Sequence, residues 1–250
     1  MTMPRRVSVE TLDQLAADDP AARRSRRDLT RVHRAMGTHS IISRGLRSLI
    51  PPYRATGALR ILEIGAGDGT LLLDVARSLA PAWQKVALTL LDRQDIVSAA
   101  TRDAYAGIGW TVTTEVVDVI DWAAQAHPRA SESAAKKPRR WDLITTTLFL
   151  HHFEGAQLDA VLGAVASCTD RFFACEPRRA WLALMGSHLV GAIGANAVTR
   201  EDAVLSVHAG FRGHDLTVLW PDQGCEWDTR EFGAGLFSHC FSARHPRACR

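Results

Sequence analysis

The residues best suited to chemistry lie in a glycine-rich segment, residues 63–69, which follows the short apolar run 59–64. That run is typical of a strand buried on both faces, and apolar positions after Asp68 recur at helical spacing. The three glycines of the segment allow a tight turn and let a ligand approach the backbone. A ligand would therefore lie against a helix N-terminus at the carboxyl end of a strand, where nucleotide-like cofactors bind in α/β sheets.

The spacing within this segment separates several kinds of cofactor. A dinucleotide fingerprint would read G-x-G-x-x-G/A, whereas Thr70 stands at its third small position. A phosphate-binding loop needs Gly-Lys-Ser/Thr, which the segment lacks. Glu63, two residues before Gly65, would repel a pyrophosphate and suits a ligand with a cationic group. A glycine-rich turn without any ligand is the structural alternative.

Residues 63–69 (E-I-G-A-G-D-G) resemble motif I of class I S-adenosylmethionine (SAM)-dependent methyltransferases, written E/D-x-G-x-G-x-G. The resemblance implies a Rossmann-like, doubly wound α/β sheet of about seven strands with an antiparallel C-terminal hairpin. It also implies SAM as cofactor and S-adenosylhomocysteine (SAH) as product. The motif residues expected to bind the cofactor are Glu63, Gly65, Ala66, Gly67, Asp68 and Gly69.

Acidic residues at the ends of the next two expected strands extend this cofactor site. By the resemblance, Asp92 accepts both ribose hydroxyls and Arg93 flanks the adenine. Capping of the next helix is an alternative role for Asp92. Asp118 and Val119 are expected to contact the adenine, with Asp121 as a competing acid three residues on.

Residues 145–153 (T-T-T-L-F-L-H-H-F) resemble the motif IV region of small-molecule and ubiquinone-type methyltransferases. In that resemblance Thr147 and Leu148 flank the methionine moiety of the cofactor. The segment lacks the N/D/S-P-P-Y/F/W signature of enzymes that methylate nucleic-acid amines. Residues 33–37 resemble an N-R-x-x-G segment that folds over the cofactor in some relatives, with His33 in place of Asn.

Methyl transfer to oxygen or carbon often requires removal of a proton, and a histidine near neutral pKa can accept it. His151 and His152 follow the fourth expected strand, close to the expected sulfonium. We predict that one of them, with His152 preferred, acts as base or orients the acceptor. Helix capping or packing is the alternative role. Glu176, at the end of the fifth strand, is predicted to orient the acceptor or the base.

Residues 178–210 separate the fifth and sixth expected strands and are predicted to roof the acceptor pocket. Polar residues there are predicted to bind the acceptor. Arg178 is predicted to bind a carboxylate or phenolate group of that acceptor. The other three predicted acceptor-binding residues are Asn196, Arg200 and His208.

No metal site is predicted, because His151, His152, Glu154 and His208 do not show the spacing of metal ligands. The five cysteines lack C-x-x-C spacing and fit reduced thiols better than a disulfide framework or a zinc site.

Alternating strand and helix patterns predict a parallel sheet with helices on both faces. The expected strands are 59–64, 85–92, 111–117, 141–147, 171–176, 214–220 and 236–242. The expected helices are 11–17, 21–50, 68–80, 95–104, 119–125, 155–166, 181–190 and one from Glu201 with Thr199 as N-cap. Residues 127–140 are expected to form an exposed loop, and Pro51-Pro52 to end the N-terminal unit.

A chain of 250 residues fits one α/β domain with additions. We expect an N-terminal helical cap or lid at 1–52 and a methyltransferase domain at 53–250. The first 50 residues carry ten arginines against five acidic residues, which indicates either a solvated helical face or a lid that meets an anionic group. The net charge of +3 is too small to indicate nucleic-acid binding.

The longest apolar run has six residues, far short of the about 20 that span a membrane, and no signal-peptide core is visible. A cytoplasmic location is therefore expected. The chain is also expected to be a monomer or a homodimer. The combined prediction is SAM-dependent methyl transfer to a small molecule, with O-methylation of an aromatic or polyketide-type metabolite favoured. The alternatives are C-methylation of a quinone-like or polyketide precursor, SAM binding without transfer, and a nicotinamide oxidoreductase.

Overall fold

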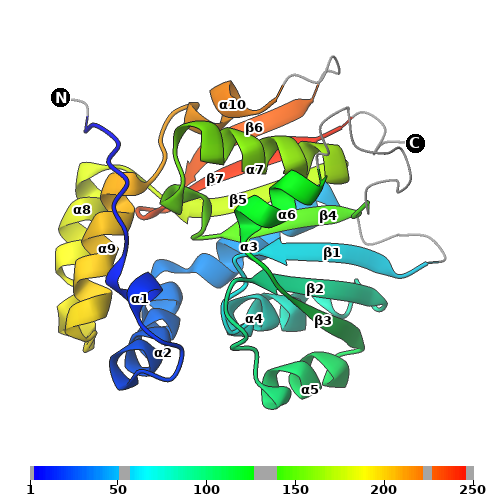
Figure 1. The fold of residues 1–250 in the computed structure, drawn as a ribbon, viewed down its shortest axis with the longest axis horizontal. Coiled ribbons are helices and arrows are strands. Elements are labelled where there is room, and N and C mark those ends of the chain that lie inside the picture. Colours follow the sequence, from blue (N-terminus) through cyan, green and yellow to red (C-terminus); the bar gives the residue numbers. More distant parts are fainter. Residues whose placement is uncertain (1–2, 51–56, 127–139, 222–226, 246–250) are drawn as a thin grey trace.

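Seven strands of the described residues form a single mixed sheet in the order β3-β2-β1-β4-β5-β7-β6 (Figure 1). The computed structural model describes residues 3–50, 57–126, 140–221 and 227–245. The strands are β1 (Leu59–Ile64), β2 (Val86–Asp92), β3 (Trp110–Val116), β4 (Leu143–Thr147), β5 (Arg171–Pro177), β6 (Asp228–Ala234) and β7 (Ser238–Arg244).

The strand order reverses between β1 and β4. The chain runs from β1 outward to β2 and β3, then returns to place β4 on the other side of β1, all in parallel. β7 pairs antiparallel with both β5 and β6. Reversal of strand order opens a crevice at the carboxyl ends of the central strands, where ligands bind in such sheets. The expected Rossmann-like sheet with an antiparallel C-terminal hairpin is confirmed.

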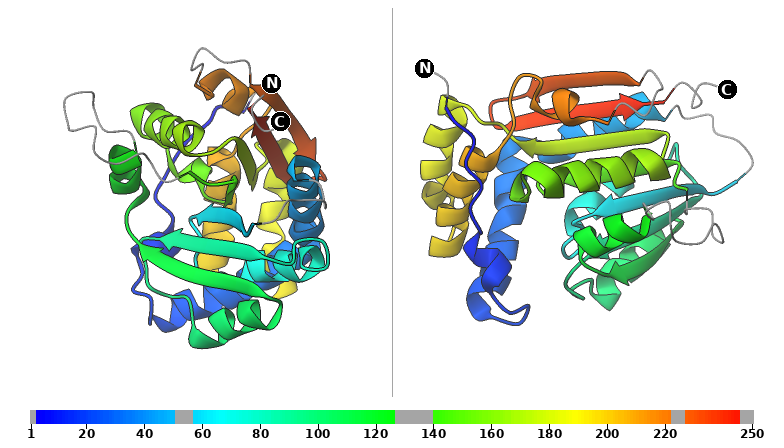
Figure 2. Two further views of the ribbon diagram at one scale, coloured as in Figure 1. Left: turned by 90° about the vertical axis from the view of Figure 1, so that its right-hand side faces the viewer. Right: turned by 45° about the horizontal axis from the view of Figure 1, so that its top comes forward.

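Helices cover both faces of the sheet (Figure 2). One face carries α3 (Thr38–Leu49), α4 (Thr70–Leu79) and α5 (Ala99–Gly107), whose apolar residues share one core cluster. The opposite face carries α6 (Val119–Ala126), α7 (Gly155–Cys168) and α10 (Asp215–Leu219), which share the second cluster.

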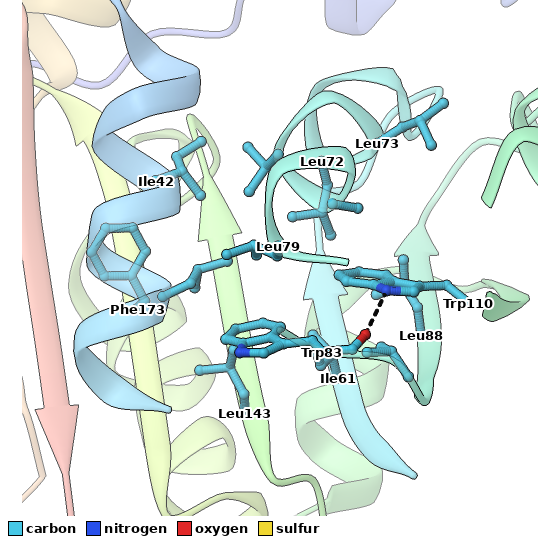
Figure 3. Close-up of a cluster of buried hydrophobic side chains, with 14 of the residues drawn as sticks. Ile42, Ile61, Leu72, Leu73, Leu79, Trp83, Leu88, Trp110, Leu143 and Phe173 are labelled. Carbon is cyan, nitrogen blue, oxygen red and sulfur yellow. Dashed lines mark hydrogen bonds between the residues drawn. The ribbon is translucent and has the colours of Figure 1, made fainter. Parts of the chain in front are cut away.

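The first core cluster joins α3 to the sheet (Figure 3). Gly45 on α3 lies so close to Phe173 of β5 that a Cβ at Gly45 would meet the ring at 2.2 Å. At the other end of the cluster, Trp110 stacks near Trp83 and donates its indole N–H to the Trp83 carbonyl at 3.1 Å. α3 is therefore part of the main core, although it falls within the N-terminal region that the sequence assigns to a cap.

The remaining helices gather at the end of the sheet where the central parallel strands terminate (Figure 1). They are α1 (Thr11–Gln14), α2 (Pro20–Met36), η1 (Leu150–His152), α8 (Trp181–His188), η2 (Val190–Ile193) and α9 (Ala197–Ala209). Residues 3–14, here called the N-terminal strap, run alongside α9, and the Arg6 N–H donates to the His208 carbonyl at 3.0 Å.

Several expected boundaries are wrong. Residues 214–220 contain α10 rather than the sixth strand, because the backbone N–H groups of Leu216 and Thr217 donate to the Glu231 carboxylate. The sixth strand, β6, is an edge strand whose residues are all exposed or half-buried, so its apolar pattern is weak. The expected helix 21–50 is two helices, which separate at Gly37 with φ +66°.

The N-cap of α9 is also different from the expectation. Asn196 caps the helix by accepting the Thr199 N–H at 2.8 Å, so Thr199 is inside the helix. The expected loop at 127–140 and the break at Pro51-Pro52 lie almost entirely outside the described residues. In the described part of the chain, none of the helices combines the length and the hydrophobicity needed to cross a membrane.

Candidate functional site

A cavity of about 1330 Å³ opens at the carboxyl ends of β1, β2 and β4. Its walls come from the glycine-rich loop, the N-terminal strap, α2, η1, α8 and α9. Sites for single small molecules usually measure roughly 300–1,000 Å³. The cavity therefore has room for a cofactor and an acceptor together.

The glycine-rich loop shapes the floor of this cavity. Gly65, Gly67 and Gly69 have φ values of +71°, +56° and +73°, which side chains rarely adopt. A Cβ on Gly65 would lie 2.1 Å from the ring of Phe149, so the loop packs directly on the segment after β4. The Tyr105 hydroxyl donates to the Gly69 carbonyl at 2.9 Å and fixes the start of α4.

Most of the residues predicted to bind a cofactor meet at the cavity wall. They are Gly65, Ala66, Gly67, Asp68, Asp92, Arg93, Asp118, Val119, Thr147 and Leu148. Gly69 and Glu63 lie behind that wall rather than on it. Leu148 has φ +53°, and such strained backbone in a bulky residue is concentrated at functional sites.

Two acidic side chains anchor the turns around the cavity. Asp92 accepts the Gly67 N–H at 2.8 Å through one oxygen and the Gln94 N–H at 2.9 Å through the other. The alternative role of Asp92 as helix cap is wrong, because Ser98 caps α5. Asp118 accepts the Ile120 N–H at 2.8 Å and lines the cavity, whereas Asp121 is exposed on α6 and lies away from it.

Two buried polar atoms near the cavity have no hydrogen-bond partner in the described structure: Glu63 Oε2 and His33 Nδ1. Burial, together with the charges of Asp92 and Asp68, raises the pKa of Glu63 well above its usual range. Burial lowers the pKa of His33 to about 4, against the opposing charge of Asp68. Buried polar groups normally have partners. Unpaired polar groups beside the loop therefore fit a polar ligand.

Arg93 does not point freely at an adenine position. Its guanidinium lies 3.5 Å from the Asp13 carboxylate on the N-terminal strap and also donates to the Asp13 carbonyl. Arg93 therefore connects the end of β2 to the strap at the cavity wall.

Glu176 is fully buried at the end of β5 and organises the segment after β4. Its carboxylate accepts the backbone N–H groups of Phe149 and Leu150 at 3.1 and 3.0 Å. It also lies 2.9 Å from Nδ1 of His151. Glu176 is not among the residues that line the cavity, so it positions His151 rather than contacting a ligand.

His151 is held between two carboxylates. Nε2 lies 3.2 Å from Glu10 of the strap, opposite the contact of Nδ1 with Glu176. Burial alone would lower the pKa of His151, but the hydrogen bonds with Glu10 and Glu176 outweigh it and raise the pKa to about 9. His151 is therefore protonated near neutral pH and is not free to accept a proton.

His152 lines the cavity as His151 does, but its electrostatic surroundings differ. Its ring centroid lies 4.2 Å from that of His151 and its Nδ1 3.4 Å from Asp13. Burial lowers the pKa of His152, and the positive charge of His151 lowers it further. A neutral imidazole at the cavity wall can accept a proton from a ligand.

Glu10, His151 and His152 bring nitrogen and oxygen atoms of metal-ligand type within 4.8 Å of one another. This grouping differs from the set of His151, His152, Glu154 and His208 considered from the sequence. Both ring nitrogens of His151 face carboxylates, an arrangement that stabilises a proton on the ring and competes with a metal. The prediction of no metal site stays a prediction.

The four residues predicted to bind an acceptor are not brought together at the cavity. Arg178 donates to the Gly235 carbonyl at 3.2 Å, and Asn196 caps α9. Arg200 is exposed beside Gly191, and the side chain of His208 lies outside the cavity wall. The roof itself is present, since residues of α8, η2 and α9 line the cavity.

Sequence reasoning missed Glu10 and Asp13, which contact the histidine pair from the N-terminal strap. The polar, irregular sequence of the strap carries no motif, and both contacts span more than 130 residues of chain. The only signal was the general expectation of an N-terminal lid.

Comparisons with protein-family models and with curated proteins gave no match. Solved structures do match. An O-methyltransferase family protein from Burkholderia thailandensis aligns over 94% of this chain and 63% of its own, with 14% identity and a TM-score of 0.59. The plantazolicin methyltransferase BpumL in complex with SAH aligns over 91% of both chains, with 12% identity and a TM-score of 0.58.

The mitomycin 7-O-methyltransferase MmcR aligns over 93% of this chain, with 19% identity and a TM-score of 0.53. This chain spans about three fifths of the length of MmcR and of the Burkholderia protein. At these identities the likeness shows a shared fold, which is the fold of SAM-dependent methyltransferases.

Proposed function

We propose that this chain is a SAM-dependent methyltransferase that transfers a methyl group to a hydroxyl of a small, uncharged acceptor. The observation that carries the proposal is that the motif I loop, Asp92, Asp118 and the neutral His152 all line one cavity. The residues proposed for the cofactor and the residue proposed to accept a proton line the same cavity, whose volume has room for two ligands. The fold shared with solved methyltransferases supports the same function.

The residues present fit the cofactor. Each Asp92 oxygen accepts one backbone N–H and keeps a further lone pair, so the carboxylate remains able to bind two ribose hydroxyls. Asp118 and Val119 would flank the adenine, and the Asp92 carboxylate would lie beside the motif I loop. When bound, SAM supplies an electrophilic methyl group.

The acceptor end favours an uncharged ligand. Side chains of α8, η2 and α9 at the cavity are largely apolar or hydroxylic, including Leu189, Ile193, Ser206 and Val207. Of the residues from α8, η2 and α9 that line the cavity, one is charged. This residue is Asp202, and its two oxygens already accept the backbone N–H groups of Thr11 and Leu12. His152 would take the proton of the acceptor hydroxyl while the walls exclude water.

Isothermal titration calorimetry with SAH tests the cofactor assignment. We expect saturable binding that Asp92→Ala weakens by more than tenfold, about 1.4 kcal/mol. Asp121→Ala removes an exposed carboxylate away from the cavity, so its affinity should stay within twofold of the wild type. Absence of SAH binding, or preference for NAD, would overturn the proposal. Confirmed binding leads directly to a screen of phenolic acceptors.

We further propose that residues 1–52 form a cap, that residues 53–250 form the catalytic domain and that residues 178–210 roof the acceptor. Within residues 1–52, α3 packs in the main core. A cytoplasmic location, a monomeric or homodimeric state and the lack of a nucleic-acid partner are proposals from composition alone.

A further inference from the structure

The N-terminal strap is attached to the molecule at several specific points. Arg5 donates to the carbonyls of Ala209 and Phe153 at 2.7 and 2.8 Å, and its guanidinium lies 4.5 Å from the centre of the Phe211 ring. Farther along, the two N–H groups at the start of α1 donate to Asp202 on α9 at 2.7 and 2.9 Å. These anchors fix the residues between them, which include Glu10.

Glu10 meets His151 from the side opposite Glu176. Its carboxylate lies 3.2 Å from Nε2 and also accepts the hydroxyl of Ser206 on α9. Burial by itself would raise the pKa of Glu10, but the hydrogen bond and charge of His151 lower it. Glu10 is therefore an ionised carboxylate in a largely enclosed position, paired with an imidazolium.

The charged groups around the histidine pair come from three directions. The strap contributes Glu10 and Asp13, and β5 contributes Glu176. The Arg5 guanidinium lies against the backbone of η1, where it donates to the Phe153 carbonyl. Asp202 of α9 is occupied by the strap backbone. The two glutamates are the groups that contact the His151 ring directly.

We infer that Glu10 is a positioning residue of the transfer site: it completes the clamp that keeps the proton on His151 and leaves His152 free to accept one. This inference rests on the proposed function. Two imidazoles with centroids 4.2 Å apart do not readily carry two positive charges. Fixing the proton on His151 therefore decides that His152, which lines the cavity, is the neutral partner.

The first test follows the ring protons of the histidines by NMR as the pH of the full chain is changed. His151 should titrate near 9 in the wild type, with its signal assigned from His151→Gln. Glu10→Gln should lower that midpoint by at least one pH unit, which is a tenfold change in proton affinity. Glu10→Asp keeps a carboxylate, so its midpoint should lie between those of Glu10→Gln and the wild type. Glu201→Gln, an exposed change elsewhere on α9, should leave it unchanged.

A wild-type midpoint near the ordinary histidine value, or an unchanged midpoint in Glu10→Gln, would overturn the inference. This readout does not depend on methyl transfer. If SAH fails to bind the wild type, the proposed function fails while the titration still decides whether Glu10 holds the proton on His151. If Glu10→Gln does not fold, Glu10→Asp supplies the comparison.

The second test applies once an acceptor is known. Glu10→Gln should bind SAH within twofold of the wild type, because Glu10 touches none of the predicted cofactor residues. Its kcat at neutral pH should fall at least tenfold, and its pH profile should shift, with KM for the acceptor little changed. An unchanged kcat and pH profile beside a shifted His151 titration would show that Glu10 has no positioning role.

Discussion

Backbone conformation at Gly65 is the residue-scale feature on which the cavity floor depends. Its φ of +71° excludes most side chains, and a Cβ there would lie 2.1 Å from the Phe149 ring. Gly65→Ala therefore has to strain the backbone and displace Phe149. We expect a loss of about 1–3 kcal/mol in the free energy of unfolding. SAH affinity should also fall more than tenfold.

A matched control separates the two causes. Gly213 has a similar φ of +58°, but a Cβ there would meet nothing within 4 Å, and it lies away from the cavity. Gly213→Ala should show the backbone cost alone and bind SAH normally. Urea denaturation and calorimetry measure both effects. Equal losses of unfolding free energy and of SAH affinity in Gly65→Ala and Gly213→Ala would show that the close approach of Phe149 to Gly65 affects neither quantity.

The same scale explains which site residues could be predicted. Gly65, Asp92 and Asp118 were identifiable because each lies at or just beyond the carboxyl end of an expected strand, and parallel strands bring these ends to one edge of the sheet. His151 and His152 were visible as a pair, yet their different protonation depends on Glu10, which arrives from a distant segment. Local sequence does not encode that contact.

At the scale of elements, the start of α9 shows how capping orders the roof. Asn196 accepts the Thr199 N–H at 2.8 Å and donates to the Ala21 carbonyl of α2 at 3.1 Å, which joins two helices that line the cavity. Asn196→Ala should cost about 1 kcal/mol in the free energy of unfolding, since it removes the cap. Asn196→Ser keeps an acceptor oxygen at the N-cap and should lose less. Chemical denaturation measures both, and equal losses would contradict the capping role.

Elements with strong apolar periodicity were predictable, whereas the edge strand β6 was not. The buried strands β1, β2, β4 and β5 lie close to their expected ranges, because burial on both faces gives near-continuous apolar runs. β6 lies at the sheet edge with mostly exposed or half-buried residues, so no such run marks it. The apolar residues at 214–220 instead form α10, which packs on the second core cluster through Leu216.

At the scale of the whole molecule, the cavity is assembled from segments far apart in the chain: the strap, α2, the strand ends and α8–α9. A ligand that fills it contacts parts that unfold together, so binding should stabilise the entire fold. At 100 times Kd, SAH should add about 2.7 kcal/mol to the free energy of unfolding. For a chain of this size that corresponds to a rise in Tm of about 5–10 °C.

Asp92→Ala provides the quantitative check on this linkage. If its Kd is tenfold weaker, the same SAH concentration is only about 10 times Kd and adds about 1.4 kcal/mol, so the rise in Tm should be roughly half as large. NAD at equal concentration should leave Tm unchanged, because the loop spacing does not match a dinucleotide-binding fingerprint. Equal shifts in wild type and Asp92→Ala would place SAH outside this cavity, since Asp92 joins the motif I loop to the end of β2 at its wall.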